Sequence, residues 1–310
     1  MSKPLVAICG ATGVQGGSVL QALLETGDYR LRGLTRNVSS DKAKALQEKG
    51  VEMVQADLAN KDDLKRAFEG ADIVYGVTNF WDPEILKNPS LEAEQGKNIA
   101  DAAKENKVQW LIWSSAPSCS KGSGGKITEV KHFDGKNDVE EYIKSIGLSF
   151  TSVNIGCYMS NFGYLIPLVP NDDGTQSLPL PVVHEDTYID LTDTASDTGP
   201  LVKAVLQNKD KYVGQRLPVV GDRLTAKQIA DTYTKVTGKT TKFQALTKEA
   251  LEGPFSYMNT GEFLGMFTWF RDFGYYGDIY GPNGSGALEA TKSVGIHQTT
   301  FEEYLKKHAK

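Results

Sequence analysis

The first part of the chain alternates uninterrupted apolar runs with segments in which apolar residues recur at helical spacing. The apolar runs predict strands at 5–8, 31–34, 51–54, 73–77, 110–113 and 150–154. The periodic segments predict helices at 18–24, 41–49, 61–68, 92–106 and 137–146. A glycine follows four of these helices, as is typical of helix C-termini: Gly27, Gly50, Gly70 and Gly147. Because strands that are apolar throughout are buried on both faces, we predict a doubly wound α/β fold with a parallel sheet.

The pattern changes after residue 154. The segments 165–169 and 178–183 are predicted to be irregular, and helices are expected at 193–207, 225–237 and 299–307. The segment 249–273 is rich in aromatic residues and methionine and is predicted to pack as helices. We therefore predict a nucleotide-binding domain at 1–154 and a smaller α/β domain at 155–310, which contributes late elements to the main sheet.

Composition excludes few function classes. The 310 residues carry 34 basic and 39 acidic side chains, a net charge of −5 without a basic block, which disfavours direct nucleic-acid binding. The three cysteines, Cys9, Cys119 and Cys157, lack metal-ligand spacing, so no metal is expected. Each is interpreted as a small buried hydrophobic residue, which is typical of a reducing compartment. Without a signal peptide or an apolar run of 18 residues, we expect no membrane segment and a cytoplasmic or nuclear location.

A glycine-rich turn follows the first predicted strand. Its sequence is GATGVQG at 10–16, and a predicted helix begins directly after it. A helix N-terminus presents unpaired amides and a positive dipole end to an anion, and glycines let a pyrophosphate approach the backbone. The spacing is GxxGxxG and differs from the common GxGxxG fingerprint.

The second strand ends at an arginine. Arg36 lies 20 residues after Gly16, and no acidic residue occurs between Tyr29 and Ser40. An acid in this region binds the ribose 2′-hydroxyl of NAD, whereas a guanidinium pairs with the 2′-phosphate of NADP. We therefore predict NADP(H) as the cofactor. The alternative is a solvated surface arginine.

Polar and aromatic residues end the third and fourth strands. Asp57 and Leu58 are expected beside the adenine, and Asp57 is alternatively the N-cap of the next helix. Thr78, Asn79 and Phe80 are expected to border the ribose and nicotinamide, since ligands of open α/β sheets bind outside the carboxyl ends of strands. The alternative for these three is loop packing.

Ser114 lies at the end of the fifth strand and is expected to bind the nicotinamide amide or a substrate carbonyl. The alternative is a hydrogen bond to the backbone of its own turn. His132 and Lys136 lie four residues apart and share a helix face. Lys136 is predicted to bind the nicotinamide ribose, with a solvated helix lysine as the alternative. His132 is a candidate proton donor or, beside Phe133, a structural histidine.

These motifs together closely resemble the NmrA-like family, a branch of the atypical short-chain dehydrogenases/reductases. The resemblance extends along the chain in GATGVQGGSV at 10–19, TRN at 35–37, VTNFW at 77–81, EQGKNIADAA at 94–103, WSS at 113–115, HFDGK at 132–136, GCYMSNF at 156–162, ADTYTKVTGK at 230–239 and TTFEEYLKKH at 299–308. It implies a Rossmann domain that binds NADP(H) and a smaller domain that closes a cleft over the nicotinamide.

The resemblance also implies roles for individual residues. The phosphate loop would comprise Gly10, Thr12, Gly13, Val14, Gln15 and Gly16. Arg36 would bind the 2′-phosphate, Asn79 and Phe80 would form the cofactor rim, and Lys136 is the lysine of an HxxxK pattern. The segment that would line the inter-domain cleft contains Gly156, Tyr158 and Asn161.

One departure separates the chain from active short-chain dehydrogenases, which use a YxxxK pair with the tyrosine as proton donor. No tyrosine here is followed by lysine four positions later, and His132 occupies the tyrosine's place. Two hypotheses follow. The first is a redox-sensing regulator that binds NADP(H) and a protein partner. The second is an NADPH-dependent reductase of a quinone, enone, carbonyl or imine, with His132 and Lys136 as its catalytic residues.

Overall fold

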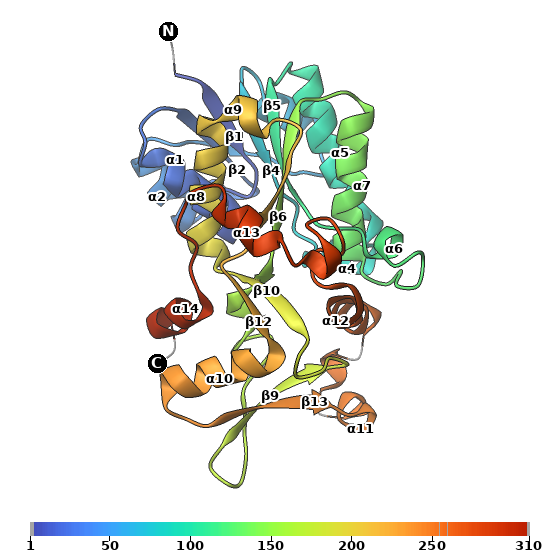
Figure 1. Ribbon diagram of the computed structural model, residues 1–310. Coiled ribbons are helices and arrows are strands. Elements are labelled where there is room, and N and C mark those ends of the chain that lie inside the picture. The colour runs from blue at the N-terminus through green and yellow to red at the C-terminus, as the bar shows by residue number, and fades with distance from the viewer. Residues whose placement is uncertain (1–2, 254, 259, 309–310) are drawn as a thin grey trace. The chain divides into compact units, whose positions relative to one another are not determined.

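Seven strands form the main sheet of this computed structural model, which describes residues 3–253, 255–258 and 260–308 (Figure 1). Their order is β11-β6-β5-β4-β1-β2-β3. The strands are β1 (Leu5–Ile8), β2 (Arg30–Thr35), β3 (Glu52–Gln55), β4 (Ile73–Gly76), β5 (Trp110–Ser115), β6 (Phe150–Ile155) and β11 (Arg216–Val219). All neighbours from β6 to β3 pair in parallel. This confirms the predicted doubly wound α/β fold and its first six strands.

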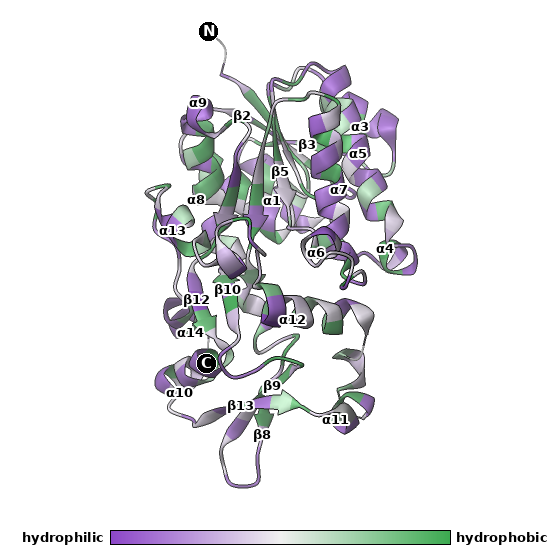
Figure 2. Cartoon of the chain, turned by 45° about the vertical axis from the view of Figure 1, so that its right-hand side comes forward, coloured by the Kyte–Doolittle hydropathy of each residue, from purple (hydrophilic) through white to green (hydrophobic). Residues whose placement is uncertain are grey.

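Helices cover both faces of this sheet (Figure 1). The helices of this part of the chain are α1 (Val14–Leu24), α2 (Asp41–Glu48), α3 (Lys61–Ala67), α4 (Pro83–Lys87), α5 (Ser90–Glu105), α7 (Lys131–Ser145), α8 (Thr194–Gln207) and α9 (Lys209–Tyr212). Residues of α3, α5 and α7 share one core with Ala7, Leu111 and Trp113 of the strands. Figure 2 shows that α5 and α7 are largely hydrophilic, and their buried apolar residues, such as Ile99 and Val139, lie in this core, as in amphipathic helices.

The chain divides into two units. The first comprises residues up to 116, 135–154 and 194–217, and the second comprises 117–134, 155–193 and the residues from 218 onward. The second unit contains two three-stranded sheets, ordered β12-β10-β7 and β13-β9-β8. Their strands are β7 (Cys157–Tyr158), β8 (Val169–Pro170), β9 (Gln176–Pro181), β10 (Tyr188–Thr192), β12 (Asp222–Thr225) and β13 (Thr241–Leu246).

The helices of the second unit include the predicted helix that ends at Thr237. They are α6 (Cys119–Gly122), η1 (Met159–Asn161), α10 (Ala226–Thr237), α11 (Lys248–Glu252), η2 (Ser256–Met258), α12 (Gly261–Phe273), η3 (Pro282–Gly284), α13 (Ala287–Lys292) and α14 (Phe301–His308). A capping box of Thr225 and Gln228 begins α10. None of the helices within the described ranges is both long and apolar enough to cross a membrane.

The prediction of an irregular segment at 178–183 is wrong, because β9 occupies most of it. The amide of Gln176 donates to Thr240, so the amides of alternate residues from 176 onward face β13. Pro179 and Pro181 therefore direct their nitrogens to the opposite edge. There β8 pairs only with Gln176 and Ser177, so no ladder hydrogen bond is lost at the prolines.

Helices α1 and α8 are in backbone contact at Gly199. A Cβ atom at this position would lie 2.1 Å from the carbonyl oxygen of Ser18. The amide of Gly199 also donates to the Ser18 hydroxyl, at 2.9 Å. Only glycine permits this backbone-to-backbone contact.

We predict that Gly199→Val lowers the free energy of unfolding by about 2–3 kcal/mol, because a forced side chain must push α8 away from α1. Urea unfolding measures the loss. Lys203→Ala, on the same helix, is the control and should be nearly neutral. A loss below about 0.5 kcal/mol for Gly199→Val would contradict the contact.

Candidate functional site

The turn between β1 and α1 is built on three glycines. Gly10 has a φ of +61°, and its carbonyl accepts from the amide of Gly13 at 2.8 Å. A Cβ atom on Gly16 would lie 2.4 Å from the Gly10 carbonyl oxygen and 2.5 Å from that of Cys9. The first turn of α1 therefore lies directly against the loop, which any side chain at position 16 would prevent.

The N-terminus of α1 has no side-chain cap. Gly13 is the N-cap residue, and Val14 after it is 56% exposed. Thr12 is half-buried within the same turn. The first-turn amides and the positive end of the helix dipole are thus available to an anion, as the sequence predicts for a phosphate loop.

A buried hydrogen-bond network joins this loop to the sheet. The side-chain oxygen of Gln15 accepts from the hydroxyl of Tyr75 on β4, at 2.9 Å, and from that of Ser114 on β5, at 2.7 Å. All three side chains are buried. The structure thus uses the side chains of Gln15 and Ser114 to hold the loop over β4 and β5, and leaves their predicted cofactor contacts untested.

Arg36 lies just beyond β2 and pairs with an acid that follows β4. Its Nη1 atom is 2.6 Å from Oδ2 of Asp82, and the side chains are 70% and 16% exposed. Asp82 is also the N-cap of α4, where it accepts from the amide of Glu84 at 3.0 Å. The Glu84 amide and then Arg36 lower the pKa of the Asp82 carboxyl. Arg36 is therefore exposed, as the alternative predicts, but it is held in an ion pair.

Asp57 and Leu58 follow β3. Asp57 is exposed and accepts from the amide of Ala59 at 2.9 Å, whereas the side chain of Asn60 caps α3. The prediction of Asp57 as the N-cap is thus wrong, because the helix begins three residues later than that role requires. The carbonyl of Leu58 accepts from the Asn98 side chain at 3.1 Å. Their predicted role beside the adenine stays a prediction.

Asn79 and Phe80 form the turn after β4. The side chain of Asn79 is exposed and accepts from the amide of Trp81, at 3.3 Å. Phe80 is buried and packs edge to face against Trp81, with ring centroids 5.4 Å apart. Trp81 remains half-exposed, so the turn presents an aromatic surface at the carboxyl edge of the sheet.

Lys136 makes a buried polar cluster with two residues of the same unit. Its ammonium group pairs with Oε1 of Glu92 and donates to the hydroxyl of Thr78 at 3.1 Å. Thr78 in turn donates to the same Glu92 oxygen, at 2.8 Å. Glu92 is only 1% exposed, and its Oε2 atom has no hydrogen-bond partner among the described residues. Lys136 is thus not the solvated helix lysine of the alternative.

His132 belongs to the second unit. Its Nδ1 atom pairs with Oε1 of Glu262, at the start of α12. The two Glu262 oxygens also accept from the backbone amides of Lys131, at 3.1 Å, and His132, at 3.0 Å. Glu262 therefore caps α7 and orients the imidazole, which also packs edge to face on Phe133.

The predicted cleft residues also lie in the second unit. A Cβ atom on Gly156 would lie 2.6 Å from the Thr192 hydroxyl, so glycine is required there by packing. Tyr158 ends β7 and is half-buried, and the Asn161 carbonyl accepts from the amide of Ile166 at 2.8 Å. Their cofactor contacts stay predictions.

Three acidic partners were missed by reasoning from sequence: Asp82, Glu92 and Glu262. Each lies far along the chain from its basic partner, by 46, 44 and 130 residues respectively. No periodicity or motif marks these acids in the sequence. Among the residues that the structure describes, no cluster of His, Cys, Asp or Glu is arranged to hold a metal ion.

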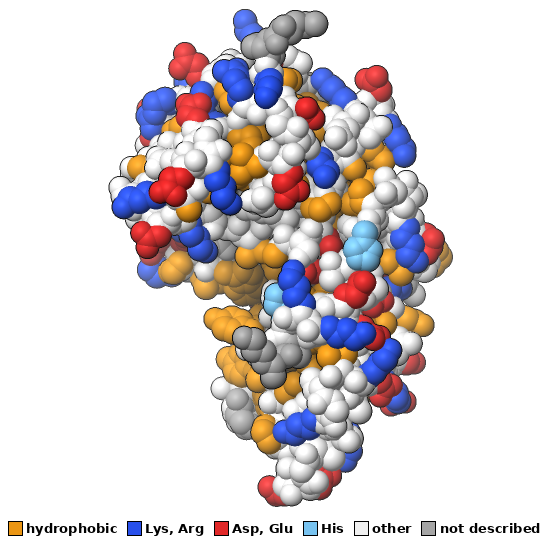
Figure 3. All heavy atoms as spheres, turned by 90° about the vertical axis from the view of Figure 1, so that its left-hand side faces the viewer, with side chains coloured by type: hydrophobic (Ala, Val, Ile, Leu, Met, Phe, Trp, Pro, Cys, Tyr) orange, Lys and Arg blue, Asp and Glu red, His pale blue; other side chains and the backbone are white. Residues whose placement is uncertain are grey.

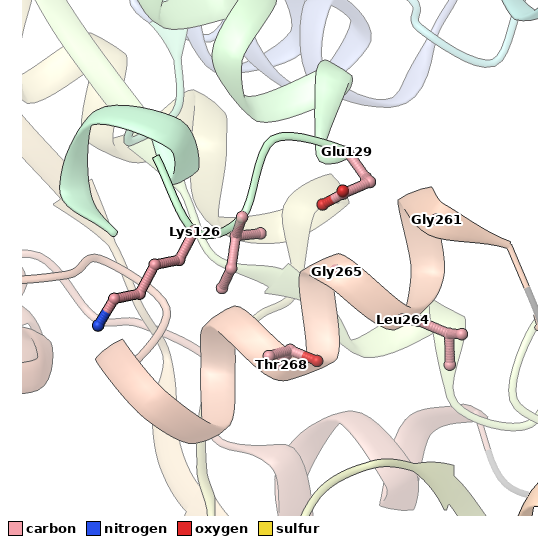
Figure 4. A pocket seen from close by; sticks show the side chains of 7 residues that line it. Lys126, Glu129, Gly261, Leu264, Gly265 and Thr268 are labelled. Atoms are coloured by element: carbon pink, nitrogen blue, oxygen red, sulfur yellow. The ribbon is translucent and has the colours of Figure 1, made fainter. Parts of the chain in front are cut away.

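A separate pocket of about 310 Å³ lies in the second unit (Figure 4). Its lining comes from the segment before α7 and from α12: Lys126, Ile127, Glu129, Gly261, Leu264, Gly265 and Thr268. None of the predicted site residues lines it. On the molecular face in Figure 3, basic and acidic side chains are interspersed.

Comparison with known proteins decides the family. The sequence model of the NmrA-like family matches residues 2–305. The chain belongs to the NmrA-like family. An NmrA-like family domain-containing oxidoreductase of Aspergillus campestris, cpsB, is 34% identical over 78% of this chain and 75% of its own length. An NmrA-like family domain-containing protein of Dictyostelium discoideum is 31% identical over 99% of this chain and 98% of its own.

Solved structures share the fold of this NmrA-like chain. NmrA, a negative transcriptional regulator crystallised with NADP, superposes with a TM-score of 0.81 at 22% identity, over 99% of this chain and 96% of its own. The NADPH-dependent quinone oxidoreductase QOR2 of Escherichia coli, complexed with NADPH, gives a TM-score of 0.75 at 20% identity, over 97% and 99%.

The Glu92–Lys136 pair yields a stability prediction. Glu92→Gln should lower the free energy of unfolding by about 3–5 kcal/mol, because it leaves a partly buried ammonium without its anion. Adding Lys136→Met should recover much of this loss, since both charges are then gone. Urea unfolding compares these variants with Glu94→Gln on the exposed part of α5. A single-variant loss below about 1 kcal/mol would contradict the pairing.

Proposed function

We propose that this NmrA-like protein binds NADP(H) through its first unit. The observation that carries the proposal is the position of Arg36 beside the glycine loop. The amide of Ala11 in the loop donates to the Leu34 carbonyl at 3.2 Å, so the end of β2 lies against the loop. One edge of the sheet thus combines an uncapped helix N-terminus, suited to a pyrophosphate, with an exposed guanidinium, suited to a 2′-phosphate.

The fit of the loop to a dinucleotide rests on the absence of side chains. Gly13 is exposed and has no side chain to cover the first turn, whereas Gly16 is buried and tolerates no Cβ atom at all. The loop backbone of Gly10, Thr12, Gly13 and Val14 would therefore hold the pyrophosphate. The shared fold supports this proposal, since NmrA and QOR2, which have it, were crystallised with NADP and NADPH.

Lys136 is proposed to bind the nicotinamide ribose. An ammonium group has three hydrogen-bond donors, and Glu92 and Thr78 occupy two of them. The third is left for a ribose hydroxyl, and Glu92 and Thr78 fix the direction in which it points. When bound, the reduced nicotinamide supplies a hydride, while the protein's own residues bind and orient the dinucleotide.

The first proposed role is a redox-responsive regulator that binds the dinucleotide and a protein partner. The tyrosine of YxxxK is absent, and His132 in its place is held by the carboxylate that caps α7. In YxxxK enzymes the positive charge of the lysine lowers the pKa of the proton donor. Here Glu92 balances that charge on Lys136. The fold shared with NmrA, described as a negative transcriptional regulator, supports this role.

The second proposed role is an NADPH-dependent reductase of a quinone, enone, carbonyl or imine. Its support is the relatives described as oxidoreductases, such as cpsB and lnaB of Aspergillus flavus at 30% identity. In this role Lys136 orients the ribose. The proton donor is the imidazole of His132, which Glu262 holds in position.

Calorimetric titration tests cofactor binding. We predict that Arg36→Ala weakens NADP⁺ binding by about 10- to 100-fold, because a charge-assisted hydrogen bond to phosphate is lost. Binding of NAD⁺ should change by less than about twofold, since NAD⁺ lacks the phosphate. Arg30→Ala, at the opposite end of β2, is the matched control. Equal losses for NADP⁺ and NAD⁺ would refute the role of Arg36.

Absorbance at 340 nm distinguishes the two roles. In the regulator role, purified protein binds NADPH but does not oxidise it with any member of a panel of quinones, enones, aldehydes and imines. Sustained oxidation that is lost in His132→Ala with NADPH binding retained, or in Lys136→Ala at saturating NADPH, would replace the regulator role with the reductase role. Circular dichroism of both variants checks that they fold.

A further inference from the structure

The acid that pairs with Arg36 is fixed more firmly than the arginine. Oδ1 of Asp82 accepts from the amide of Glu84 at the N-terminus of α4, which leaves Oδ2 for Arg36. The Asp82 side chain is mostly buried, whereas most of the Arg36 side chain is in solvent. A ligand that engages Arg36 will therefore meet a negative charge that stays in place.

The Asp82 carboxylate carries a full negative charge at neutral pH. The amide of Glu84 and the guanidinium of Arg36 both stabilise the ionised form and lower the pKa of the carboxyl. A phosphate monoester brings about −1.5 to −2 further charges at pH 7. When the Asp82 carboxylate and the phosphate contact the same guanidinium, they are separated only by the width of that group. This separation is well below the Debye length of about 8 Å at physiological salt, so salt screens the repulsion only in part.

Two effects of Asp82 oppose each other. By holding Arg36, the acid restricts a flexible side chain before the ligand arrives, which favours binding. An exposed ion pair of this kind is weak, so this gain is small. The repulsion between carboxylate and phosphate involves a larger charge product at short range. The net effect of Asp82 is therefore to weaken binding of the phosphorylated ligand.

We propose that Asp82 is a specificity-determining residue that weakens binding of the 2′-phosphorylated dinucleotide relative to its unphosphorylated counterpart. This proposal rests on the proposed binding of NADP(H) and adds a residue that limits the selectivity that Arg36 confers. The carboxylate repels only the phosphate, because NAD(H) places a neutral hydroxyl at the same point of the ribose.

The test is Asp82→Asn, which removes the charge and keeps a side-chain oxygen to accept from Glu84. Calorimetric titration with NADP⁺ should give an affinity about three- to tenfold higher than that of the wild type. The affinity for NAD⁺ should stay within about twofold of the wild-type value. The gain in NADP⁺ affinity should shrink as NaCl is raised from 50 to 300 mM, because salt screens the repulsion between exposed charges. Asp231→Asn on α10, an exposed acid paired with Lys227, removes the same charge elsewhere and should change neither affinity.

Each other outcome overturns a distinct claim. An unchanged NADP⁺ affinity in Asp82→Asn, or equal gains for NADP⁺ and NAD⁺, overturns the proposed repulsion. A reduced NADP⁺ affinity also overturns it and makes Asp82 a residue that positions Arg36. If the wild type and Asp82→Asn bind neither dinucleotide, the proposed function fails, and the selectivity proposal fails with it.

Discussion

The candidate site depends on the contact between the first turn of α1 and the loop that precedes it. Gly16 lies so close to the Cys9 and Gly10 carbonyls that no Cβ atom fits between them. This contact sets the height of the helix N-terminus above the sheet, and the network of Gln15, Tyr75 and Ser114 holds the loop there. Because the loop also bonds to the end of β2, the same contact places Arg36 at the edge where the helix dipole emerges.

Each basic residue expected to act at the site is paired with an acid. Arg36 pairs with Asp82, Lys136 with Glu92, and His132 with Glu262. The three pairs differ in burial, and this decides what each can do. The exposed Arg36 can turn toward a ligand because its ion pair is weak, although Asp82 stays in place beside it. Lys136 cannot move away from Glu92 without leaving a buried carboxylate unpaired, so it acts from a fixed position.

The main sheet and the positions of the glycine loop and Arg36 could be predicted from sequence, because each depends on local patterns. An apolar run, a glycine turn and a helix specify one another within about 20 residues. The acidic partners could not be predicted, since they depend on which distant helix packs against which strand. Strand β9 was missed for a related reason. Its prolines are tolerated only because β8 leaves the outer edge unpaired, and no local pattern shows that pairing.

The same limit applies to Asp57, which sequence reasoning offered as the cap of α3. Asn60 takes that role because it directly precedes Lys61, the first residue of α3. The start of the helix was thus predictable, whereas Asp57, three residues before Asn60, lies too early in the turn to cap it.

The central claim is that the loop at Gly16 and the guanidinium of Arg36 together bind NADP(H). A crystal structure of the protein grown with NADP⁺ tests it most directly. The account predicts the pyrophosphate on the first-turn amides of α1 and the 2′-phosphate within hydrogen-bonding distance of Arg36. Density for the dinucleotide elsewhere, or a 2′-phosphate directed away from Arg36, would contradict it.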